Sequence, residues 1–223
     1  MANDSTAGYG CRAVMNVGST PATSGQSEYK LYDYAGAAFN TIYKGDPVQL
    51  NVGTTAAEKG YLMDSTYDTM DDGKPGGADW RNNTAASTLA VGVFNGCFYV
   101  DSSTSKPTWS NSANSGTNFG TDYNTGSTDG TAFVMDNPLQ EFNMRLNSST
   151  GWQVNDLGLF YNTGDNGATG INGMSDERLV LANVNANNMF TLVRGANVPG
   201  HNDYTADGSD VVVVFNPASH AYN

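Results

Sequence analysis

The stretch QEFNMRL, residues 140–146, carries the most regular hydrophobic pattern of the chain. Its apolar side chains, Phe142, Met144 and Leu146, occupy every second position, with polar residues between them. Successive side chains of a β-strand point to opposite faces of the sheet. The alternation therefore predicts a strand that turns one face towards a core and the other towards a polar environment.

Short apolar runs recur on both sides of this stretch, separated by segments rich in Gly, Ser, Thr and Asn, which favour turns and loops. One segment, residues 175–185 with Ser175 as N-cap, has a helical alternative. The pattern predicts a mainly β protein, a β-sandwich or barrel of jelly-roll type with long loops. Besides 140–146, the expected strands are 42–43, 48–50, 61–63, 89–100, 131–135, 157–161, 178–181, 189–193 and 211–215.

Residues 89–100 (LAVGVFNGCFYV) differ from the other strands because apolar residues stand at both odd and even positions. This pattern predicts a strand buried on both faces, with Gly92 and Gly96 where a neighbouring backbone comes close. Cys97 lies between aromatic residues, so we expect it to be a buried structural cysteine. The following segment, with Lys106, Pro107 and Trp109, is expected to be a loop that contacts another molecule.

The chain divides into an expected N-terminal arm and a core. Residues 1–28 contain isolated apolar side chains without a sustained period, and such a segment cannot offset its ordering entropy alone. We therefore expect an extended arm over 1–28 and a β-rich core domain over 29–223. Two long polar loops are expected, at 64–87 and 101–130, and loops of that length often carry function.

The charge balance argues against several classes of partner. The formal net charge is −12, with ten Lys and Arg residues that form no cluster, whereas proteins that grip a phosphate backbone need clustered basic residues. No run approaches the roughly 18 apolar residues of a membrane span, and the beginning of the chain lacks the apolar region of a signal peptide. We expect neither nucleic acid nor membrane as a partner, and synthesis in a cytoplasm.

No pattern for catalysis or cofactor binding stands out. The two histidines, His201 and His220, and the two cysteines lie in no metal-ligand spacing. The run DYTADG (203–208) resembles the opening of a calcium loop, but Val214 stands where the bidentate glutamate is needed. GYGCRA (8–13) lacks the strand and helix of a dinucleotide site. We expect no enzyme and no cofactor; a looser calcium site at 64–79 stays open.

The three tryptophans, Trp80, Trp109 and Trp152, lie in loops or at strand ends of the expected fold. An exposed tryptophan serves as a platform for a sugar ring or as an anchor in a protein interface. It can equally fold back over its own loop. The sequence leaves these alternatives open for each of the three.

Three segments resemble structural proteins of tailed bacteriophages: IYKGDPVQL (42–50), LAVGVFNGCFYVDSSTSKPTWSN (89–111) and AFVMDNPLQEFNMRL (132–146). The similarity is greatest to proteins of marine and cyanobacterial phages that coat the head as decoration, or cement, proteins. It covers roughly residues 40–195 and consists of strand and turn motifs. The resemblance implies a mainly β protein on the outer surface of the virion capsid. It further implies a homotrimer bound to the major capsid protein, without cofactor or catalysis.

Six residues are candidates for contacts to the capsid or between subunits, because Trp and Arg dominate the energetics of interfaces. The alternative function is a tail or fibre module that binds a receptor or glycan through its Trp loops. The candidates are Tyr9, Arg12, Trp80, Arg81, Lys106 and Trp109.

Overall fold

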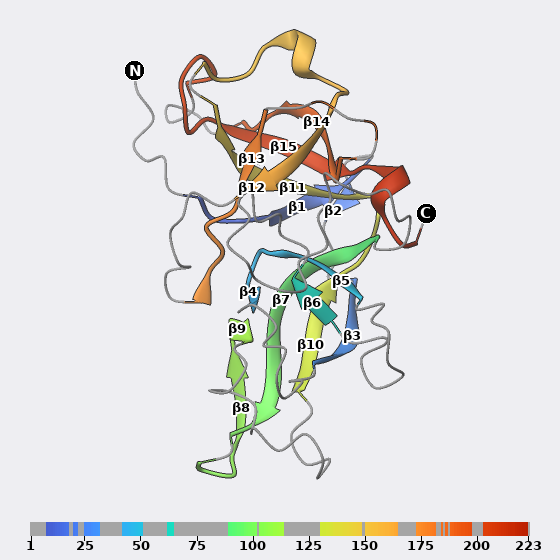
Figure 1. Ribbon diagram of the computed structural model, residues 1–223, viewed down its shortest axis with the longest axis vertical. Helices are drawn as coiled ribbons and strands as arrows, with labels where there is room; N and C mark the ends of the chain where they lie inside the picture. The colour runs from blue at the N-terminus through green and yellow to red at the C-terminus, as the bar shows by residue number, and fades with distance from the viewer. Residues whose placement is uncertain are drawn as a thin grey trace, which may run out of the picture.

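Strands make up 57% of the part of the chain that the computed structural model describes, and no α-helix occurs in that part. The mainly β fold expected from the sequence is confirmed. Two sheets with separate cores follow one another along the longest axis (Figure 1). The described residues are 8–17, 20–21, 25–31, 42–50, 62–64, 89–101, 103–113, 130–148, 150–164, 173–181, 184, 186, 188–197 and 203–222.

The first sheet closes into a five-stranded barrel. Its strands follow the order β13-β12-β14-β15-β11, and a parallel pairing of β11 with β13 closes the ring. Two further strands, β1 and β2, extend the sheet beyond β11. The bounds are β1 Arg12–Asn16, β2 Thr20–Pro21, β11 Gln140–Asn147, β12 Phe160–Gly164, β13 Arg178–Val180, β14 Phe190–Gly195 and β15 Asp210–Phe215.

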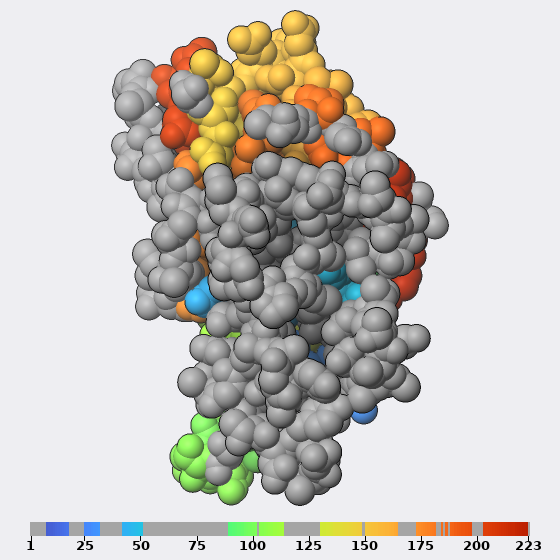
Figure 2. Space-filling view, in the orientation of Figure 1, coloured from blue at the N-terminus to red at the C-terminus, as the bar shows by residue number. Residues whose placement is uncertain are grey.

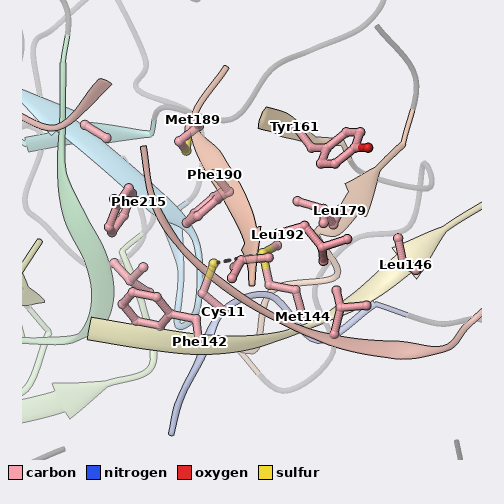
Figure 3. Close-up of a cluster of buried hydrophobic side chains, with 14 residues drawn as sticks. Cys11, Phe142, Met144, Leu146, Tyr161, Leu179, Met189, Phe190, Leu192 and Phe215 are labelled. Atoms are coloured by element: carbon pink, nitrogen blue, oxygen red, sulfur yellow. Dashed lines mark hydrogen bonds between the residues drawn. The ribbon is translucent and has the colours of Figure 1, made fainter. Parts of the chain in front are cut away.

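The alternating stretch that the sequence singles out forms β11. Phe142, Met144 and Leu146 are fully buried, as the alternation predicts. They lie in the core cluster of the barrel shown in Figure 3, where the Phe142 ring meets Phe215 edge to face at 5.7 Å between centroids. Glu141, on the other face, is also buried, and Arg194 of β14 pairs with its carboxylate at 2.7 Å, which compensates the loss of hydration of that charge.

The second sheet has the order β3-β10-β7-β5-β6, and β8 pairs with the C-terminal half of β7. Its core holds Phe94, Cys97 and Val134, all fully buried. A two-stranded sheet, β4 with β9, lies beside it. The bounds are β3 Gln26–Leu31, β4 Ile42–Tyr43, β5 Pro47–Leu50, β6 Leu62–Asp64, β7 Ala90–Val100, β8 Pro107–Ser110, β9 Ser112–Ala113 and β10 Gly130–Met135.

The long strand β7 connects the two cores. Ala90 and Val93, near its start, belong to the barrel core, whereas Phe94 and Cys97 belong to the core of the second sheet. Figure 1 shows the barrel at the upper end of the molecule and the hairpin of β7 and β8 reaching its lower end. The two cores share the first residues of β7, where Val91 of the second core lies between Ala90 and Val93, and from Phe94 onward the strand contributes to the second core.

The segment 1–28, expected to be an extended arm, instead adds strands to both sheets in its described part. β1 pairs with β11 in antiparallel register, with Arg12 opposite Asn143, and β3 pairs with β10. The segment gains backbone hydrogen bonds at the edges of the two sheets. Such pairing does not depend on side chains, so the weak hydrophobic pattern of the segment could not predict it.

One other expectation is corrected. Residues 101–130, expected to be one loop, contain β8 and β9, which pair with β7 and β4. Residues 178–180 form β13, in agreement with the expected strand 178–181, so the helical alternative does not apply to them. Residues 65–87 of the other expected loop lie outside the described residues, and Asp64 ends β6.

Candidate interaction surface

An apolar surface covers the outer face of the second sheet, where β7, β8 and β10 lie side by side. Phe98 and Val100 of β7 and Trp109 of β8 expose between 44% and 49% of their surface, and Phe133 of β10 is half-buried beside Trp109. We call these four residues the aromatic patch. Large exposed apolar groups that lie together mark interaction sites more often than single ones do.

Strand alternation places these side chains on one face. Along the C-terminal half of β7, Cys97 and Tyr99 point into the core, while Phe98 and Val100 point outward. Phe98 lies directly opposite Trp109 on β8 and opposite Thr131 on β10. Three neighbouring strands thus hold the patch, so little conformational freedom is lost when a partner binds.

Gly96 makes room for the ring of Trp109. A Cβ atom at this glycine would lie 2.4 Å from Cζ2 of Trp109, and Gly96 has a φ of +123°, which disfavours other residues. The Trp109 ring lies across Gly96 and reaches Phe133, with 5.3 Å between the ring centroids. Its Nε1 donates to Oδ1 of Asn111 at 3.4 Å. The ring is therefore held against the sheet while about half of the residue stays exposed.

Charged residues border the aromatic patch. Lys106 is exposed in the β7–β8 turn, where Asp101 accepts hydrogen bonds from Ser103 and Thr104. Hydrogen bonds from Thr104, followed by those from Ser103, hold the pKa of Asp101 below its usual value. On the other side, Lys30 of β3 is exposed opposite Thr131. Positive and negative groups therefore both lie at the rim.

Two predicted contact residues, Tyr9 and Arg12, lie on the barrel and belong to an internal cluster. The guanidinium carbon of Arg12 lies 4.1 Å from the centre of the Tyr9 ring, and that of Arg145 lies 5.0 Å from it. The Tyr9 hydroxyl bonds to Asp210, which also pairs with Arg145 at 3.0 Å. Burial, followed by the charge of Asp210, raises the pKa of Tyr9. These contacts give Tyr9 a role within the chain.

Among the predicted contact residues, the structure brings Lys106 and Trp109 together with groups that the sequence analysis missed. Residues 89–100 are apolar at both parities, which predicts burial on both faces, but Phe98 and Val100 are exposed. Their parity relative to Cys97 is the signal that could have identified them. Trp80 and Arg81 lie outside the described residues.

Both cysteines are buried and free. The Cys97 thiol donates to the carbonyl oxygen of Ser112 at 3.6 Å, and burial raises its pKa to about 12. The Cys11 thiol lies 3.5 Å from the Met144 sulfur, and burial raises its pKa too. A reactive cysteine needs a lowered pKa and access to solvent. Both sites instead have the surroundings of structural cysteines.

The segment that resembles a calcium loop has its carboxylates engaged within the chain. Asp203 accepts from the backbone and hydroxyl of Thr205, and Asp207 accepts from the backbone of Ser148. Within the described residues, no three His, Cys, Asp or Glu side chains gather as a metal site. His201 and the acidic residues at 65–79 lie outside that part.

His220 is buried at the C-terminal end. Its Nδ1 accepts from the backbone of Tyr222 at 3.1 Å, and burial lowers its pKa while Asp136 acts in the opposite direction. Among the described residues, no helix is long and apolar enough to cross a membrane.

Comparisons of the chain with protein-family models, with curated proteins and with solved structures find no match.

Proposed function

We propose that this chain is a decoration protein that binds the outer surface of a tailed-phage head and stabilises the shell through inter-subunit contacts. Its partners are the major capsid protein and further copies of itself in a homotrimer, assembled on the virion in the host cytoplasm. No catalysis is involved. The proposal rests on the resemblance of residues 42–50, 89–111 and 132–146 to phage structural proteins, and on the aromatic patch.

The aromatic patch supports a role in protein contacts. Tryptophan is among the residue types enriched at interface hot spots. Trp109 lies beside Phe98, Val100 and Phe133, which extend the apolar surface around it. Strand pairing on both sides of β7 and the packing over Gly96 fix these side chains before a partner binds. Preorganisation of this kind lowers the entropic cost of association.

The rim of the patch indicates the chemistry of the partner. Lys106 is exposed beside the patch on a chain whose formal net charge is −12. Because opposite charges across an interface steer binding, the fitting surface is apolar, with an acidic group within reach of Lys106 and a basic group within reach of Asp101.

The direct test measures retention of the purified chain on phage heads that lack decoration. We expect Trp109→Ala to lower retention at least about tenfold, because it removes the central anchor of the patch. Leu139→Ala is the matched control, since Leu139 is an apolar residue that is 57% exposed in the turn between β10 and β11. Phe98→Ser provides a second variant that leaves the packing of Trp109 on Gly96 in place.

The outcomes separate the function from the site. If the wild-type chain fails to bind heads, the proposed function is overturned. If it binds but Trp109→Ala and Phe98→Ser bind equally well, the aromatic patch is not the docking surface. Circular dichroism of each variant shows whether the β fold is kept.

A second candidate function is binding of a receptor glycan by a tail or fibre module. One observation favours it: the Trp109 ring lies across Gly96 and the residue stays about half exposed, an arrangement that suits stacking with a sugar ring. A glycan array distinguishes the two. Specific binding that Trp109→Ala abolishes, together with no affinity for heads, would favour the glycan function.

A further inference from the structure

A second apolar surface lies at the other end of the molecule, on the barrel. The loop between β11 and β12 exposes Val154, Leu157 and Leu159, and Val193 of β14 lies beside it. We call these four residues the barrel tip. Val154 is 76% exposed, and the other three are 36% or 37% exposed. The 3-10 helix η3, Val154–Asp156, is the short amber helix at the top of Figure 1.

The barrel tip is held rigidly although it is exposed. Asp156 caps η3 by accepting from the backbone of Gln153 at 2.6 Å, and it also accepts from the Tyr161 hydroxyl at 3.2 Å. Gly158 donates to the carbonyl of Leu192, and Leu192 donates to the carbonyl of Leu159. Since the loop is fastened to β14, its apolar side chains are presented in a fixed arrangement.

The loop that carries the barrel tip contains few charged residues. Asp156 is the one charged residue between positions 148 and 163, and its carboxylate is engaged by the two hydrogen bonds just described. Arg194, next to Val193, pairs with Glu141 at 2.7 Å. Two copies of a chain with a net charge of −12 repel each other, so they approach most easily through a surface with few acidic groups.

We propose that the barrel tip is a self-association surface, where a second copy of this chain packs its own barrel tip. The contact is isologous or surrounds a cyclic axis, so that Val154 of one copy lies close to Val154 of the next. Figure 2 shows the tip at one end and the β7–β8 hairpin at the other, so a copy joined through the tip keeps its aromatic patch free. The inference rests on the proposed function for the crowding of copies, but its tests are made in solution without phage heads, so the two can fail separately.

The size of the barrel tip sets the strength of this contact. A stable dimer buries about 800 Å² on each partner, and four partly exposed aliphatic side chains supply much less. We therefore expect a dissociation constant on the order of 0.1–1 mM in solution. The contact becomes effective where copies are held side by side, because a high local concentration replaces affinity.

Cysteine cross-linking tests the contact directly. The chain has two cysteines, both buried, so Val154→Cys adds the one exposed thiol. With diamide as the oxidant, we expect V154C to form a covalent dimer about tenfold faster than Val17→Cys, because the contact raises the effective concentration of the paired thiols. Val17 is the matched control, a valine that is 47% exposed in the β1–β2 turn. The wild-type protein is the control that shows whether Cys11 and Cys97 form cross-links under the same conditions.

Sedimentation velocity gives a second readout. The sedimentation coefficient of the wild-type chain should rise as the concentration approaches about 1 mM, and Val154→Glu should abolish the rise while Val17→Glu keeps it. Because Val154 is 76% exposed, the substitution should leave the unfolding midpoint unchanged. Equal cross-linking rates for V154C and V17C, no dimer from either, or a rise that V154E retains would each overturn the inference.

Discussion

Trp109 and Trp152 are placed in the same way but differ in what covers them. Each indole ring lies against a glycine of a neighbouring strand, where a Cβ would be 2.4 Å from Cζ2 of Trp109 at Gly96 and 2.6 Å from Cζ2 of Trp152 at Gly195. Trp152 also packs against the barrel core and meets Tyr204 edge to face at 5.4 Å. Trp109 contacts Phe133 and stays 49% exposed.

This difference separates a structural tryptophan from one that is available to a partner. Trp152 is tied into the barrel by its ring and by its backbone, which donates to the carbonyl of Tyr204 at 3.1 Å. The Tyr204 hydroxyl in turn donates to the carbonyl of Ala196 at 3.1 Å. Nothing comparable covers Trp109 among the described residues. We call the space left by the missing side chain of Gly96 or Gly195 the glycine notch, and the residues that shield the indole ring from solvent its cover. The notch holds the ring in both cases. The cover, present for Trp152, decides whether the ring is structural or available to a partner.

The largest expected effect is the loss of stability in Trp152→Ala. We expect the free energy of unfolding to fall by about 3 kcal/mol, because a large ring that packs against the core leaves a cavity. Trp109→Ala should cost about 1 kcal/mol, since half of that residue is already in water. Urea denaturation measures both values. Equal losses in the free energy of unfolding for the two variants would show that Trp109 contributes as much to the fold as Trp152, and the distinction between the two tryptophans would fail.

Gly96→Ala tests the notch itself. We expect a loss of about 2 kcal/mol, because Gly96 has a φ of +123° and the added Cβ would collide with Trp109. In Trp109→Ala the collision disappears but the backbone strain remains, together with the carbonyl oxygen of Ser110 at 3.0 Å. The double variant should therefore lose less than the sum of the two single losses. Strict additivity in a double-mutant cycle would show that the ring does not occupy the notch.

The sequence predicts most of the strands of this fold, but it does not predict which strands pair with each other. The alternation at Phe142, Met144 and Leu146 identifies β11 and its buried face because that information is local. The parallel pairing of β11 with β13, which closes the barrel, joins segments whose periodicity does not name a partner. For the same reason β1 and β3 look like an arm in the sequence, although they pair at sheet edges.

The candidate surface is predicted in part. Trp109 and Lys106 stand out by residue type, but the sequence cannot tell an exposed tryptophan from one like Trp152 that is covered by its neighbours. Phe98 and Val100 escape because β7 is apolar at both parities, and only its position beside β8 shows which face lies outside. The contact of Trp109 with Phe133 passes over Gly96, so it depends on the register of three strands.

Tyr204→Phe gives a smaller effect that sharpens the account of the cover. Removing the hydroxyl takes away its hydrogen bond to Ala196 and keeps the ring against Trp152. We expect a loss of about 1 kcal/mol in the free energy of unfolding. Tyr222→Phe serves as the control that removes another hydrogen-bonded hydroxyl, because Tyr222 bonds to the Tyr29 hydroxyl at 2.7 Å at an exposed site away from the tryptophan. A loss as large as that of Trp152→Ala would mean that the hydroxyl, and not the ring, holds the cover in place.

The smallest expected effect concerns Cys97, which lies next to Gly96 on β7 but faces the core. In the native protein at pH 8 we expect iodoacetamide to label neither cysteine, because burial raises the pKa of Cys97 to about 12 and that of Cys11 well above its usual value. In urea both should react. Trp109→Ala should leave Cys97 unlabelled, since Trp109 covers the opposite face of the strand. If iodoacetamide labelled Cys97 in the Trp109→Ala variant, Trp109 would be shielding the core as Trp152 does. That result would contradict the distinction between the two tryptophans.

The raised pKa of Cys97 also makes the stability of the protein depend on pH. The thiol in the unfolded chain ionises as the pH rises above about 9, whereas the native thiol stays protonated. The contribution of Cys97 to the free energy of unfolding is therefore fully present below pH 9 and is lost between pH 9 and 12. Replacing Cys97 by Ala should flatten that part of the stability profile, and Trp109→Ala should not.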